Sequence, residues 1–200
     1  MAGKIAPHSG VDGLVTHLRL HISPGFALMA AALYYLGGGM LLGAVVLADS
    51  AHELGHIAAL HITGARIDRL RLGGGGAVLE CGGLRSPTEE LIVLVMGPLA
   101  GLIVALVGLA AATPFAHYTA AAALLATGFN LMPALPLDGG RIAWLLIANA
   151  VSPNAADVIL RVSGCLCAAG IVALGGITRS LAAVAAGIYL AALVNFPSMR

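Results

Sequence analysis

The stretch His52-Glu53-Leu54-Gly55-His56 decides how the rest of this 200-residue chain is interpreted. Two histidines four residues apart lie on the same face of a helix, so both rings can reach one metal ion. The glutamate beside the first histidine is then placed to accept a proton from the attacking water. Such a short motif recurs by chance in soluble helices. In a very apolar chain, however, burying these groups is costly and marks a functional site, so we interpret the motif as a zinc site.

The composition indicates an integral membrane protein. The chain is 60% hydrophobic and 10% charged, with a mean hydropathy of +0.98. Soluble domains carry about 25% charged residues. The net charge of +1 and the 4% aromatic content give no reason to expect a nucleic-acid partner. We therefore expect a single polytopic membrane domain over residues 1–200.

Four apolar segments in the second half of the chain are candidates for membrane-spanning helices, each of which needs about 20 mostly apolar residues. Pro133 and Pro136 end the second of these segments, because proline removes a helix donor and clashes with the preceding turn. The segments cover residues 91–112, 114–131, 155–174 and 180–196.

The first part of the chain has two interpretations. In one, residues 26–48 form a single span and residues 49–62 form an interfacial helix. In the other, Gly37-Gly38-Gly39 turns the chain between two spans, and the second span carries the histidines and ends near Thr63. We prefer two spans, because the single span leaves the apolar helix around His52 without a membrane partner. The predicted fold is therefore an all-α integral membrane protein with about six transmembrane helices.

Basic residues gather on one side of a six-span arrangement with both termini inside. Only Arg179 falls outside, and Arg161 lies near the inner end of its helix. This asymmetry follows the positive-inside rule. It predicts a multi-pass protein of the cell membrane with its active site toward the cytoplasm. The other basic residues lie in cytoplasmic segments: Lys4, Arg19, Arg66, Arg69, Arg71, Arg85, Arg141 and Arg200.

A small membrane-associated β-hairpin is expected directly after the metal-binding helix. Two short pieces that are expected to be extended flank Gly73-Gly74-Gly75-Gly76, as in a hairpin with a glycine turn. An unpaired edge of this hairpin could receive a peptide as an added strand. By composition alone, a flexible glycine-rich loop explains the stretch equally well.

A third metal ligand is expected, because catalytic zinc usually has three protein ligands and one open position. Asp138 is the best candidate. It follows a helix broken by Pro133 and Pro136, and irregular backbone at membrane depth is tolerated only in protein or around a water-filled cavity. The alternative is that Asp138 caps the helix that begins near Gly139. Glu80 is a weaker rival for the third position.

Asp49 lies one helical turn before His52 and Glu53. It could hydrogen-bond a ligand histidine from behind, or it could face a neighbouring helix or a water channel. The sequence does not choose between these roles.

Three motifs together resemble the site-2 protease family of intramembrane zinc metalloproteases. They are the pentapeptide from His52 to His56, the pair Gly97-Pro98 in the next helix, and Asn-x-x-Pro-x-x-Pro-Leu-Asp-Gly-Gly-Arg from Asn130 to Arg141. The opening stretch, Leu18-Arg19-Leu20-His21-Ile22-Ser23-Pro24, is more similar to the sporulation-factor-processing branch of that family. The resemblance covers nearly the whole chain.

The resemblance implies a site and a reaction. His52, His56 and Asp138 would bind one Zn²⁺ per chain, Glu53 would be the catalytic acid and base, and Asn130 would support the substrate or the developing oxyanion. The substrate would be a membrane-tethered or membrane-associated regulatory protein, cleaved in regulated intramembrane proteolysis. Neither a PDZ domain between the motifs nor a C-terminal regulatory domain is expected. A homo-oligomer or a regulatory membrane partner is left open.

The alternative function is a metal transporter, or a membrane protein that binds metal without proteolysis, which would use the same three ligands. Transport needs polar groups that continue along a path to the other membrane face, and beyond Asp49 the helices offer few. A transporter should also tolerate replacement of Glu53, whereas a protease should not.

Overall fold

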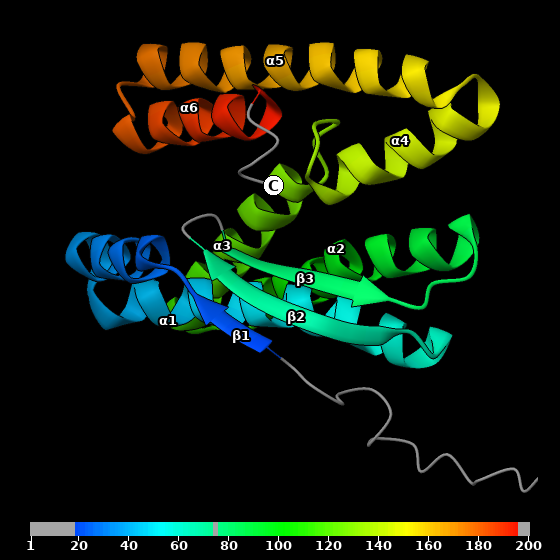
Figure 1. The fold of residues 1–200 in the computed structure, drawn as a ribbon. Helices are drawn as coiled ribbons and strands as arrows, with labels where there is room; N and C mark the ends of the chain where they lie inside the picture. The colour runs from blue at the N-terminus through cyan, green and yellow to red at the C-terminus, as the bar shows by residue number, and fades with distance from the viewer. Residues whose placement is uncertain (1–18, 74–75, 196–200) are drawn as a thin grey trace, which may run out of the picture. The chain divides into compact units, whose positions relative to one another are not determined.

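The computed structural model describes residues 19–73 and 76–195 and is mostly helical (Figure 1). The chain forms two compact units, Met1–Ala123 and Leu124–Arg200, and α3 runs from the first into the second. The elements in chain order are β1 (Arg19–Ile22), α1 (Pro24–Thr63), β2 (Arg66–Gly73), β3 (Gly76–Gly82), α2 (Pro87–Ala110), α3 (Pro114–Asn130), α4 (Asp138–Ala150), α5 (Pro153–Thr178) and α6 (Leu181–Asn195).

Each of the four predicted apolar segments forms a helix in the structure, namely α2, α3, α5 and α6. Among the described residues, α1, α2 and α5 are long and apolar enough to cross a membrane, whereas α6 is apolar but shorter. The helix α3 has 17 residues and α6 has 15. The structure thus supports a polytopic membrane fold, and it does not confirm the count of six spans.

The first helix is interrupted at the predicted glycine turn. Gly38 has φ 66° and ψ −163°, which is outside the helical region and is accessible almost only to glycine. The break divides α1 into residues 24–37 and residues 39–63, and the histidine motif lies in the second part. A single uninterrupted helix over residues 26–48, the alternative interpretation, does not occur.

The metal helix ends at a glycine that leads directly into the sheet. Gly64 has a left-handed φ of 70°, and its N–H bonds the carbonyls of His61 and Leu60. The N–H of Ala65 also bonds the Leu60 carbonyl, at 3.0 Å. These bonds satisfy the last carbonyls of the helix, as a glycine at this position usually does. As a result only Gly64 and Ala65 separate the end of α1 from the start of β2.

The predicted hairpin is confirmed, and it is part of a three-stranded sheet. The strands β2 and β3 pair antiparallel, and their register runs from Arg66 opposite Gly82 to Gly73 opposite Gly76. The register is irregular between Ile67 and Arg69. The sheet order is β1-β2-β3, so β2 is central. The strand β1 pairs parallel with β2, and Leu20 lies opposite Leu70. This strand was not predicted. The turn residues 74–75 lie outside the described residues.

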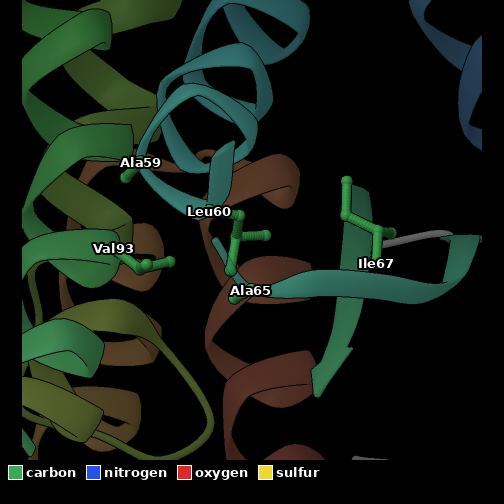
Figure 2. Packing of buried hydrophobic residues seen from close by; sticks show 5 residues of the cluster. All are labelled: Ala59, Leu60, Ala65, Ile67 and Val93. Carbon is green, nitrogen blue, oxygen red and sulfur yellow. The ribbon is translucent and has the colours of Figure 1, made fainter. Parts of the chain in front are cut away.

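A small apolar core joins the end of α1, the start of β2 and α2 (Figure 2). Ala59 and Leu60 lie at the end of the metal helix, and Val93 of α2 points toward them. Leu60 is 1% exposed and Val93 is 7% exposed. Ala65, which directly precedes β2, and Ile67 within β2 complete the cluster. The sheet is therefore attached to the same helix pair that carries the histidines.

The second unit is built around a helical hairpin of α5 and α6, with α4 beside α5. Small residues bring α5 and α6 together. A β-carbon at Gly164 would come within 2.8 Å of Val194 Cγ2, and one at Gly187 would come within 2.7 Å of Val172 Cγ2. Such close contacts between small residues are the usual means by which helices associate in a bilayer.

Candidate metal centre

The two motif histidines are buried and their rings converge. His52 is 5% exposed and His56 is 8% exposed, although both are polar. Their Nε2 atoms lie 3.1 Å apart, and the rings meet edge to face with centroids 4.8 Å apart. The four-residue spacing thus has the predicted consequence that both rings point at one place.

The orientation of His56 is set by the neighbouring helix. Its Nδ1 lies 2.8 Å from the backbone carbonyl of Val93 on α2. A carbonyl can only accept, so Nδ1 carries the proton and Nε2 carries the lone pair. A metal-binding histidine typically makes this kind of bond with its second nitrogen, which fixes both the tautomer and the ring plane.

Two glycines let α1 and α2 approach closely enough for this bond. A β-carbon at Gly97 would collide with the ring of His56. On the other helix, a β-carbon at Gly55 would collide with the Met96 carbonyl and come within 2.8 Å of Ala100 Cβ. Gly55 of the histidine motif and Gly97 of the Gly97-Pro98 pair are therefore both needed for the packing of α1 against α2.

Glu53 and Asp49 are the acidic residues beside the histidines on α1. Glu53 is half-buried and next to His52 in sequence, so it lies at the edge of the ligand face rather than on it. Asp49 is also half-buried, one turn earlier on the same helix. Its role stays a prediction.

Asp138 belongs to the second unit, where it is half-buried as the first residue of α4. The N-cap of α4 is Leu137, whose side chain makes no capping bond. Asp138 is therefore the first residue inside the helix and not its N-cap. The stretch before it turns tightly, with a cis peptide between Leu135 and Pro136.

The backbone around Asp138 is held by two further glycines. A β-carbon at Gly139 would collide with the carbonyl of Leu131, and one at Gly140 would collide with the backbone of Ala134. The first turn of α4 therefore lies directly against the last turn of α3. Asn130, which is half-buried, is the final residue of α3. Glu80, the rival ligand, is a residue of β3 opposite Arg69.

The histidine pair fits a zinc ion. Four tetrahedral ligands at about 2.0–2.1 Å from zinc place two ligand nitrogens roughly 3.3 Å apart. The observed separation of 3.1 Å between the Nε2 atoms matches that spacing. Zinc sites with histidine and carboxylate ligands are also common among catalytic centres, which usually have three protein ligands. The structure supports metal binding by the histidine pair on chemical grounds.

Known proteins that resemble this chain are metalloproteases or sporulation proteins. Stage IV sporulation protein FB of Bacillus subtilis is 34% identical over 161 residues, which cover 75% of this chain and 55% of that protein. A zinc metalloprotease of Methanocaldococcus jannaschii is 32% identical over 110 residues, covering 49% of this chain and 31% of that protein. The chain thus spans about half or less of the length of these relatives. No family model matches it.

The fold has a solved counterpart. A structure described as the site-2 protease from Methanocaldococcus jannaschii matches with a TM-score of 0.72 and 20% identity, over 95% of this chain and 92% of that one. The chain therefore shares its fold with that structure. These similarities agree with the resemblance to the site-2 protease family that the motifs indicated.

The packing of His56 on Gly97 gives a testable prediction. Gly97→Ala should displace the His56 ring and lower the zinc content of the purified protein at least severalfold, because the added methyl collides with the ring. Gly170→Ala is the matched control. It lies inside α5 with nothing within 4 Å of its β-carbon, so zinc content should be unchanged. Metal analysis of both purified variants is the measurement, and equal zinc in Gly97→Ala and wild type would contradict the packing account.

Proposed function

We propose that this chain is an intramembrane zinc metalloprotease that hydrolyses a peptide bond within or next to the membrane. The observation that carries the proposal is the pair of converging, buried histidines with Glu53 beside them, in which the Val93 carbonyl fixes His56. The names of the relatives, a zinc metalloprotease among them, support the same activity. The substrate class is a membrane-tethered or membrane-associated regulatory protein.

His52, His56 and Asp138 are the proposed ligands of one Zn²⁺ per chain. Two buried imidazoles and a carboxylate form a usual donor set for a catalytic site with an open position. When bound, zinc would supply Lewis acidity that polarises a carbonyl and lowers the pKa of a water molecule to about 7.

Glu53 and Asn130 are the proposed catalytic residues beyond the ligands. The Glu53 carboxylate accepts a proton from the attacking water and donates it to the leaving amine, which is general base and then general acid catalysis. The Asn130 side-chain amide donates a hydrogen bond to the substrate carbonyl as negative charge develops on its oxygen. Both residues are half-buried, which keeps their hydrogen bonds partly protected from water.

The membrane arrangement in this proposal has six spans, in which the two parts of α1 count separately. The break at Gly38 supports the separation. The excess of basic residues in the alternate connections supports a cytoplasmic active site in the cell membrane. Residues 1–200 act as one protease domain. This domain is compatible with assembly into a homo-oligomer or with binding of a regulatory membrane partner. A metal transporter is the alternative function, and Glu53 distinguishes the two.

We predict that Glu53→Gln abolishes most cleavage and keeps the metal. The amide has nearly the shape of the carboxylate but cannot accept the proton of the attacking water. The rate at which Glu53→Gln cleaves single-span regulatory proteins in detergent should be at least a hundredfold below that of wild type. Zinc chelation should abolish cleavage by the wild-type protein. Zinc content should match wild type. Near wild-type cleavage by Glu53→Gln would remove the general base role, and full metal transport by this variant would favour a transporter.

The strand β3 is the proposed contact for substrate outside the membrane helices. In the three-stranded sheet it lies at one edge, and β2 is its strand neighbour among the described residues. An extended peptide can add to such an edge through main-chain hydrogen bonds with little demand on its sequence. A helical substrate must unwind before its amide can be attacked, and pairing with β3 would hold it extended.

The register identifies which β3 residues would bind the added strand. The hairpin closes at Gly73 opposite Gly76 with two residues between them, so this pair exchanges hydrogen bonds. Antiparallel pairs then alternate along the strand. Gly76, Val78 and Glu80 therefore bond β2, whereas the N–H groups of Ala77 and Leu79 face outward.

We therefore predict that proline at Ala77 or Leu79 lowers cleavage, by about tenfold, and preserves zinc content and folding. Proline removes an outward donor there without breaking a β2 bond. Val78→Pro is the contrasting variant, since it removes a bond within the hairpin and should lower stability. Thermal unfolding and cleavage rates measured on all three variants decide the matter. If Ala77→Pro and Leu79→Pro cleave like wild type, β3 does not bind the substrate.

A further inference from the structure

The hydroxyl of Thr127 on α3 is buried and has no hydrogen-bond partner among the described residues. The residue is 2% exposed. A buried polar group without a partner is unfavourable, and native structures contain few of them. A ligand that hydrogen-bonds the Thr127 hydroxyl would remove this unfavourable state.

Other threonines in this chain show that the missing bond is not a general property of threonine in its helices. Thr63, Thr119 and Thr178 each donate to the carbonyl four residues earlier, at 3.0, 2.9 and 2.8 Å. This bond within the helix is the usual solution for a hydroxyl in an apolar environment. The Thr127 hydroxyl makes no such bond, and it is therefore available to a group that is not part of the chain.

Thr127 occupies a particular place in the second unit. It lies one turn before Asn130 on α3, and residues three apart share a face of a helix. The next element is the tight turn that leads to Asp138, and the close contact of Gly139 with Leu131 holds the start of α4 against the end of α3. The hydroxyl is thus on the helix end that also carries the proposed oxyanion donor, and the start of α4, which carries the proposed third ligand, lies against that end.

We propose that the Thr127 hydroxyl is a substrate-binding group that hydrogen-bonds the main chain of the unwound peptide next to the bond that is cleaved. This proposal rests on the proposed protease function. An unwound peptide at membrane depth has N–H and C=O groups that need partners, because hydrocarbon offers none. A hydroxyl both donates and accepts, so Thr127 can pair with either group. Because it makes no bond within α3, no protein bond has to break when the peptide arrives.

The test compares Thr127→Val with Thr127→Ser. Valine keeps the shape and removes the hydroxyl, whereas serine keeps the hydroxyl. Thr127→Val should lower kcat/KM for zinc-dependent cleavage of a single-span protein about tenfold, which equals about 1.4 kcal/mol. Thr127→Ser should stay within about threefold of wild type. The thermal unfolding midpoint of substrate-free Thr127→Val should be unchanged or higher, because the variant removes an unpartnered buried hydroxyl.

The matched control is Thr119→Val, in the same helix. Thr119 is 4% exposed and its hydroxyl bonds the Phe115 carbonyl, so its loss should leave kcat/KM of the folded enzyme unchanged. The proposal is overturned if Thr127→Val cleaves like wild type, or if serine loses as much activity as valine. Those outcomes leave the protease function intact when wild type cleaves and Glu53→Gln does not. If wild type cleaves none of the single-span proteins, the protease function and this proposal fall together.

Discussion

The hydrogen bond between His56 Nδ1 and the Val93 carbonyl is the contact on which the proposed site depends. It ties the helix that carries both histidines to α2, and it leaves Nε2 of His56 directed at His52. The bond is possible only because Gly55 and Gly97 let the two helices approach closely. A histidine buried in an apolar helix pair without this bond would have a mobile ring and an undefined tautomer, and neither suits a metal ligand.

The same contact joins the site to the sheet. Val93 contributes its carbonyl to His56 and its side chain to the apolar cluster with Leu60 and Ile67. Gly64 then ends α1 and places β2 immediately after it. The strands proposed to hold the substrate are therefore anchored to the helices that hold the histidines. A rigid connection of this kind is what a protease needs if the edge that binds an extended peptide is to deliver its scissile bond to one place.

Several features could be predicted from the sequence because they depend on local rules. The histidine spacing follows from helical periodicity, the break at Gly38 from its glycine run, and the hairpin from two short extended pieces around a glycine run. Other features depend on contacts between distant segments and had no local signal. The strand β1 forms because it pairs in parallel with β2, although Arg19 and Arg69 are far apart in sequence. The partner of His56 is a backbone carbonyl, which every residue has.

In the proposed site two imidazoles and one carboxylate hold one zinc ion, and X-ray absorption spectroscopy at the zinc edge of the purified protein can decide whether they do. We expect about one zinc per chain, with only nitrogen and oxygen neighbours at about 2.0–2.2 Å and the scattering pattern of two imidazoles. Asp138→Ala should lower zinc affinity and remove an oxygen neighbour. A sulfur neighbour at about 2.3 Å, a single imidazole, or full zinc affinity in Asp138→Ala would contradict it.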